Sequence, residues 1–99
     1  MSDPDAPHRP PRLRPHPDVV ARRVDDQAVL VQLSSNQVYS LNRTGARLWE
    51  LLSEGSNPAE AYERLLEEFD VPADELRTEV DAFLDLLLRE QLVSVDDGS

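Results

Sequence analysis

The fold of this chain is decided by residues 36–49, which read NQVYSLNRTGARLW. Gln37 to Leu41 is a short β-rich run in which every second side chain points to the same face. Asn42 then offers a side-chain oxygen that can cap a helix, and the apolar residues after it, including Leu48 and Trp49, follow helical spacing. The stretch therefore predicts a strand that leads directly into a helix.

Two further β-rich segments precede this stretch, Val19 to Val24 and Ala28 to Leu33. The separators between the three segments are short and rich in Asp, Asn and Ser, which satisfy their own backbone in turns and tolerate positive φ. The apolar side chains that share a face are Val29, Val31 and Leu33 in the middle segment and Tyr39 and Leu41 in the last. We therefore expect a three-stranded antiparallel meander with those side chains on its buried side.

Three helices are predicted downstream. The first ends near Gly55, the second has Asn57 as its cap and Pro58 at its first position, and the third runs from about Ala73 to Glu90. Leu92 to Val95 follow as an apolar tail or short strand. Strands followed by helices, without βαβ alternation, indicate an α+β domain with a winged-helix-like outline, a three-stranded antiparallel sheet followed by three helices.

The first seventeen residues differ in composition from the rest. Residues 1–17 hold six prolines and three arginines with hardly an apolar side chain, and proline removes a backbone donor and fixes φ. The expectation is a disordered Pro/Arg-rich tail over residues 1–17 and one domain over residues 18–95.

Charge restricts the partners that this chain can take. The net charge is −10, and residues 43–99 alone carry −10 while residues 18–42 carry −1. Such a surface repels nucleic acid and anionic membranes and favours basic or apolar partners. We also expect a cytoplasmic location, since the sequence has no apolar run long enough for a signal or a membrane span.

The inventory of reactive side chains is small. The sequence has no cysteine and no lysine, its two histidines, His8 and His16, lie in the predicted tail, and it has no glycine-rich phosphate loop. The carboxylates fall on the polar faces of the predicted helices without the spacing of a cation site. We expect no catalytic residue, no metal and no cofactor.

The third helix has a wider apolar surface than a single core stripe requires. Beside the core positions, Ala82 and Leu86 form a second stripe that is edged by Glu75, Glu79 and Glu90. This stripe either packs internally or forms the wall of a groove. In the second case, the sheet edge beside it can accept an extended peptide as an additional strand.

Residues 29–33 and 36–49 together resemble the signature of PqqD-like proteins: an apolar strand, a turn, Y-x-L-N-x-T-G-A-x-x-W and a helix. The resemblance covers about residues 18–95. It implies a recognition element for ribosomally made, post-translationally modified peptides, most similar to the stand-alone form that serves lasso peptides. By this resemblance, the leader of a precursor peptide adds to the third strand and lies against helix three, and a separate cysteine-protease-like leader peptidase then acts on it.

Carried over to this sequence, the resemblance implies ten peptide-binding residues. They are Gln37, Val38, Tyr39, Ser40 and Leu41 on the strand and Glu75, Glu79, Ala82, Phe83 and Leu86 on the helix. Two other functions stay open. One is a PqqD-type peptide chaperone for a radical SAM enzyme, and the other is a winged-helix nucleic-acid binder, which the charge disfavours.

Overall fold

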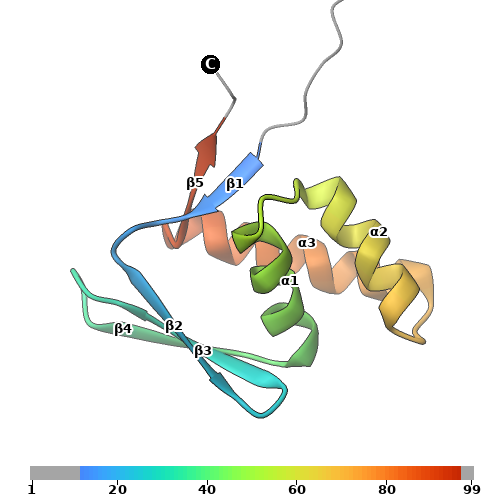
Figure 1. Cartoon of the computed structure of the whole chain (residues 1–99), viewed down its shortest axis with the longest axis horizontal. Helices are drawn as coiled ribbons and strands as arrows, with labels where there is room; N and C mark the ends of the chain where they lie inside the picture. Colours follow the sequence, from blue (N-terminus) through green and yellow to red (C-terminus); the bar gives the residue numbers. More distant parts are fainter. Residues whose placement is uncertain (1–11, 97–99) are drawn as a thin grey trace, which may run out of the picture.

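The computed structural model describes residues 12–96 as two small antiparallel sheets and three helices (Figure 1). One sheet has the order β2 (Val19–Val24), β3 (Gln27–Gln32), β4 (Gln37–Leu41). The helices that follow are α1 (Arg43–Ser53), α2 (Pro58–Glu68) and α3 (Ala73–Arg89). The second sheet pairs β1 (Arg12–Pro15) with β5 (Val93–Asp96). The predicted three-stranded sheet followed by three helices is confirmed.

Both turns of the larger sheet use residues that tolerate the left-handed backbone region. Asp25, in the turn between β2 and β3, has φ 57°, and Asn36, just before β4, has φ 59°. Asp and Asn visit this region more readily than other non-glycine residues because their short polar side chains bond to the local backbone. The sequence prediction of two consecutive hairpins therefore rested on the correct residues.

The caps predicted for the first two helices are present. The side chain of Asn42 accepts a hydrogen bond from the backbone of Gly45 at 3.0 Å. Asn57 and Glu60 cap each other's backbone, and Pro58 follows at the first helical position. Only one residue separates β4 from α1, so the sheet edge and the first helix are fixed relative to each other.

Among the described helices, none combines the length and apolar character that a bilayer crossing demands.

The face of β3 that packs on the helices is not the one that the sequence predicted. The register places Ala28 opposite Leu41 and Leu30 opposite Tyr39, and Leu30 is fully buried. Val29 and Val31 therefore point away from the helices, and Leu33 is 54% exposed. The middle strand is apolar on both faces, so its own alternation could not decide which face is buried. The pairing with β4, whose Leu41 is in the core, decides it.

The predicted tail boundary is also wrong. Residues 12–15 form β1 against β5, and Leu13 is only 5% exposed within the core. The backbone of His16 continues the connection by donating to the carbonyl of Leu92 at 3.0 Å. Four residues gain a partner that is about eighty positions away, which local composition cannot reveal. The short strand expected at Leu92 to Val95 is confirmed as β5, whereas residues 1–11, with His8, lie outside the described residues.

Candidate functional site

β4 is an edge strand. Within the described part of the chain, it pairs with β3 on one side and with no strand on the other. Gln37, Val38 and Ser40 are exposed along it, and Val38 keeps 61% of its surface. An edge of this kind presents unpaired backbone N–H and C=O groups, to which an extended chain can bind.

α3 lies beside this edge strand and is tied to it by side chains. The hydroxyl of Tyr39 donates to Oε1 of Glu90 at 2.8 Å, and Asn42, just after β4, donates to Oε1 of Glu79 at 3.4 Å. The side chain of Gln32 on β3 also donates to the carbonyl of Glu90 at 3.0 Å. These hydrogen bonds hold the second half of α3 beside residues 39–42.

The five predicted contact residues of α3 share one side of the helix. At about 100° per residue they span roughly a quarter to a third of its circumference, next to the core stripe of Leu76, Val80 and Leu87. Ala82 and Glu75 are exposed, and Leu86 is half-buried without belonging to the core cluster. We define the unpaired edge of β4 and this side of α3 together as the β4/α3 face.

Two of the ten predicted residues have structural roles that limit what they offer a ligand. Leu41 is 2% exposed, so only its backbone is available to an added strand. Phe83 packs over Gly45 at the start of α1, where a Cβ would lie only 2.6 Å from its Cζ. The Gly in the T-G-A part of the sequence motif is thereby explained as a space requirement.

Two residues outside the predicted set also belong to this face. Glu90 receives the hydroxyl of Tyr39, and this hydrogen bond is the main reason why the pKa of Tyr39 is raised. Asn42 combines its capping role with the contact to Glu79. The sequence indicates that Glu90 belongs to this face, because Glu90 lies one helical turn beyond Leu86 on the same side of α3.

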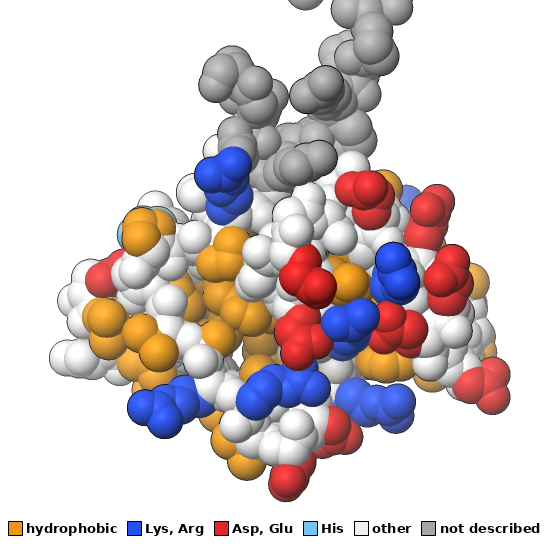
Figure 2. Space-filling model, viewed as in Figure 1, with side chains coloured by type: hydrophobic (Ala, Val, Ile, Leu, Met, Phe, Trp, Pro, Cys, Tyr) orange, Lys and Arg blue, Asp and Glu red, His pale blue; other side chains and the backbone are white. Residues whose placement is uncertain are grey.

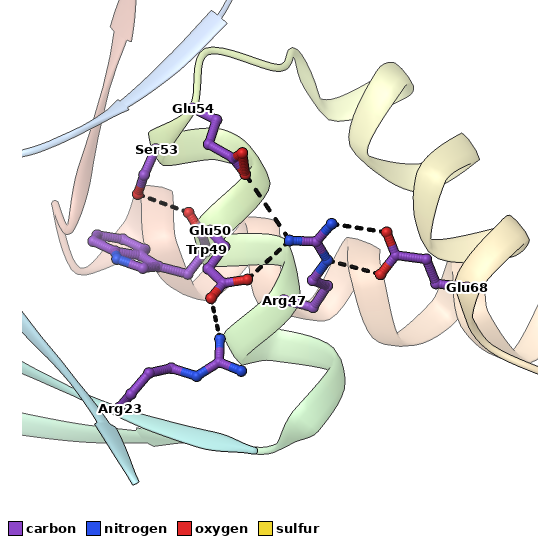
Figure 3. Close-up of polar contacts among 7 residues, drawn as sticks. All are labelled: Arg23, Arg47, Trp49, Glu50, Ser53, Glu54 and Glu68. Carbon is purple, nitrogen blue, oxygen red and sulfur yellow. Dashed lines mark hydrogen bonds and ion pairs between the residues drawn. The ribbon is translucent and has the colours of Figure 1, made fainter. Parts of the chain in front are cut away.

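Figure 3 shows an ion-pair network that is centred on Arg47 of α1. Arg47 on α1 binds both carboxylate oxygens of Glu68 on α2, at 2.7 and 2.8 Å, and also Glu50 at 2.9 Å. Glu50 in turn pairs with Arg23 of β2. The hydrogen bonds from Arg47 lower the pKa of Glu68, and the two carboxylates raise the pKa of Arg47. The network joins β2 of the larger sheet to α1 and α2.

Two hollows in the surface lie away from this face. One, of about 500 Å³, is lined by β2 and α1 residues such as Ala21 and Trp49, and the other, of about 430 Å³, lies between Tyr62 of α2 and Leu84 of α3. None of the ten predicted residues lines either hollow. Residues 12–96 also contain no group of three potential metal ligands. The unpaired edge of β4, with α3 beside it, makes the β4/α3 face suited to binding a chain along a strand.

Comparisons with known proteins agree with this architecture. Residues 27–93 match the family model described as coenzyme PQQ synthesis protein D (PqqD). A solved structure of TbiB1 in complex with the TbiA(beta) leader peptide is 28% identical, with a TM-score of 0.74 over 82% of this chain and 94% of that chain. A lasso peptide synthetase B1 complexed with the leader peptide shares the fold at 23% identity, with a TM-score of 0.72 over 84% and 98% of the two chains. No curated protein sequence matches. The match over residues 27–93 shows that the chain belongs to the PqqD family, as the strand–turn–helix signature predicted.

Proposed function

We propose that this protein binds the leader segment of a ribosomally made precursor peptide, of the lasso class, and presents it to a separate leader peptidase. The leader adds as a strand to β4 and lays alternate side chains against α3. The observation that carries the proposal is the unpaired edge of β4 with α3 tied beside it. The likeness to TbiB1, which was solved with a leader peptide, supports the choice of ligand.

Each half of the β4/α3 face contributes a different part of the recognition. Backbone hydrogen bonds along residues 37–41 give affinity that depends little on the leader's sequence. Selectivity comes from α3, where Ala82 and Leu86 offer apolar contact for every second leader side chain. Glu75 and Glu79 favour basic residues in the leader. The protein itself performs no chemistry in this scheme, and its role is to hold the leader extended.

A paired substitution on α3 tests this function. Changing Leu86 to Glu places a carboxylate where the leader side chains dock, next to Glu79 and Glu90. We expect the affinity for a fluorescein-labelled leader peptide of a lasso precursor to fall at least tenfold, about 1.4 kcal/mol. The measurement is a fluorescence-polarisation titration. The free energy of unfolding should change by no more than about 1 kcal/mol, because Leu86 lies outside the core cluster.

Leu88→Glu is the matched control. Leu88 is 43% exposed and lies on a different side of α3, so the same charge should leave the leader affinity within about twofold of the wild type. If Leu86→Glu instead unfolds the domain, Leu86 is a core residue. If both variants bind like the wild type, the leader does not lie on α3.

A further inference from the structure

β2 is the second edge strand of the larger sheet, and the helices leave its inner side uncovered. Within the described residues, β2 pairs with β3 alone. Ala21 lies opposite the fully buried Leu30 and therefore faces the helices, yet its side chain is exposed. Arg23, the next inward position of β2, is exposed as well. The helices therefore cover β3 but not β2.

A trough of about 500 Å³ lies between β2 and α1. Its apolar lining comes from Ala21, Ala28, Ala46 and Trp49, and the three alanines have side chains too small to fill the space. Figure 2 looks onto this part of the molecule: hydrophobic side chains lie between the larger sheet and α1, with basic side chains along the lower border. We call this hollow the β2/α1 trough.

The backbone of β2 presents hydrogen-bonding groups along the trough. Leu33 donates its backbone N–H to the carbonyl of Asp18 at 3.0 Å, which marks these two opposite residues as a hydrogen-bonded pair. Bonded and non-bonded pairs alternate along an antiparallel ladder, so the N–H and C=O groups of Ala21 and Arg23 turn away from β3. Val19 follows the same alternation, because its N–H donates to a carbonyl in the loop before β2. An extended chain could therefore bond to the open edge of β2.

Trp49 adds a side-chain donor to the wall of the trough. The residue is 6% exposed, and its indole N–H makes no hydrogen bond within residues 12–96. No buried side-chain nitrogen or oxygen in the same residues lacks a partner, so this N–H still reaches solvent. Figure 3 shows the indole extending from α1 on the side away from Glu68. The N–H is thus placed to donate to a carbonyl or carboxylate of a ligand.

The charge on β2 is opposite to the charge beside β4. β2 contains Arg22 and Arg23 and no acidic residue, whereas α3 carries Glu75 and Glu79 next to the β4 edge. Arg23 pairs with Glu50, but Arg22 has no ion pair in the part of the chain that the structure describes. Electrostatic complementarity therefore favours an acidic chain at the edge of β2.

We propose that the β2/α1 trough binds an extended acidic segment of another polypeptide as a strand added to β2. Alternate side chains of this segment are apolar and lie in the trough over Ala21 and Trp49, and the side chains between them are carboxylates beside Arg22. A second copy of the chain fits less well, because pairing of β2 with β2 brings the arginines of both copies onto one edge. The segment does not displace a leader, since the trough and the β4/α3 face lie at opposite edges of the sheet.

An NMR titration of the isotope-labelled full-length protein tests this proposal. The probe is a blocked hexapeptide of alternating glutamate and valine, and in the matched control peptide each glutamate is replaced by arginine. The chain has a single tryptophan, so the indole N–H signal of Trp49 reports on the trough without ambiguity. We expect the acidic peptide to shift this signal and the backbone N–H signals of Ala21 and Arg23 in a saturable way. The basic peptide should bind the trough at least about tenfold more weakly.

Two variants of β2 should each weaken binding of the acidic peptide at least about tenfold. Ala21→Pro removes an N–H on the open side of an edge strand, where proline is tolerated. Arg22→Glu reverses the charge at an exposed position. The control is Arg77→Glu, which makes the same reversal at an exposed position of α3 and should bind within about twofold of the wild type. Thermal unfolding is measured for each variant, and Arg22→Glu decides the outcome if Ala21→Pro does not fold.

Three results would overturn the proposal. The first is the absence of a saturable shift at Trp49, or equal affinity for the two peptides. The second is a set of shifts confined to residues 37–41, because the acidic segment would then bind the edge of β4. The third is a wild-type dimer, seen by sedimentation, that Ala21→Pro converts to a monomer, because the occupant would then be a second copy. Leader affinity, which Arg22→Glu should leave within about twofold of the wild type, is measured separately, so leader binding can hold even where this proposal fails.

Discussion

The contact between Gly45 and Phe83 joins the start of α1 to the β4/α3 face, because the Phe83 ring packs on the backbone of Gly45. Gly45 is buried at the first turn of α1, and the Phe83 ring occupies the space where a Cβ would stand. The same ring belongs to the predicted peptide contacts. A single methyl group on α1 is therefore expected to affect both the packing of α3 and the binding of a leader.

Gly45→Ala should destabilise the domain by about 1–3 kcal/mol, the usual cost of forcing an extra methyl into a packed site. The reason is that Phe83 must leave its position by several tenths of an ångström or more. The measurement is chemical unfolding in urea, with leader affinity determined on the same sample. Because Phe83 is one of the predicted peptide contacts, its displacement is also expected to weaken leader binding.

Phe83→Leu in the Gly45→Ala background is the control for this contact. The smaller side chain leaves room for the methyl group, so the double variant should lose less stability than the two single changes added together. If the two losses in unfolding free energy are strictly additive, the Phe83 ring does not limit the size of the side chain at residue 45.

At the scale of elements, the small sheet of β1 and β5 fastens the two ends of the described chain together. β1 enters the fold through Leu13, which lies in the same core as Leu92 and Val93. This contact reverses the expectation that residues 1–17 contribute nothing to the fold. Prolines next to β1 do not prevent this four-residue strand from forming, because its side chain Leu13 is buried and its partner strand, β5, is already in place.

Deletion of residues 1–16 should therefore lower the free energy of unfolding by at least about 2 kcal/mol, the low end for losing a buried leucine. For a domain of this size, the midpoint temperature would fall by roughly 10 °C. Differential scanning calorimetry measures the change. Deletion of residues 1–11 is the control because it retains all of β1, and it should move the midpoint by less than about 5 °C. Equal midpoints for the two deletions would mean that β1 does not stabilise the domain.

For the whole molecule, the ion-pair network around Arg47 links the large sheet to α1 and α2 in a protein whose net charge is −10. The hydrogen bonds from Arg47 keep the pKa of Glu68 below its ordinary value of 4.5 in the folded protein. A lowered pKa means that the unfolded chain takes up the proton more readily, so this pair stabilises the fold above about pH 4.5 and the contribution is lost as pH falls below it.

Glu68→Gln isolates that contribution from the general relief of charge repulsion on acidification. At pH 7 the variant should be less stable than the wild type, and the difference should shrink as pH falls from 4.5 toward 3. Urea unfolding at pH 7, 5, 4 and 3 measures both proteins. A difference that stays constant over this range would show that the carboxylate of Glu68 gains nothing from Arg47.

The local structure and the family could both be predicted from the sequence. Helix caps at Asn42 and Asn57, turns at Asp25 and Asn36, and the order of strands and helices follow from side chains that act on their own backbone. Such effects extend over a few residues, which is why the boundaries could be predicted. The position of β4 followed in the same way, because its residues lie within 36–49, whereas its role in binding a peptide is a prediction from the resemblance to PqqD-like proteins.

Which surfaces are buried and which segments meet depends on the packing of the whole fold. β3 is apolar on both faces, so the register with β4 was needed to bury Leu30 and leave Val29 and Val31 on the outer side. The pairing of β1 with β5 and the contact of Glu90 with Tyr39 join residues about eighty and fifty positions apart. Long-range pairings of this kind depend on the mutual fit of whole elements. The residue pattern within one element does not identify the element with which it pairs.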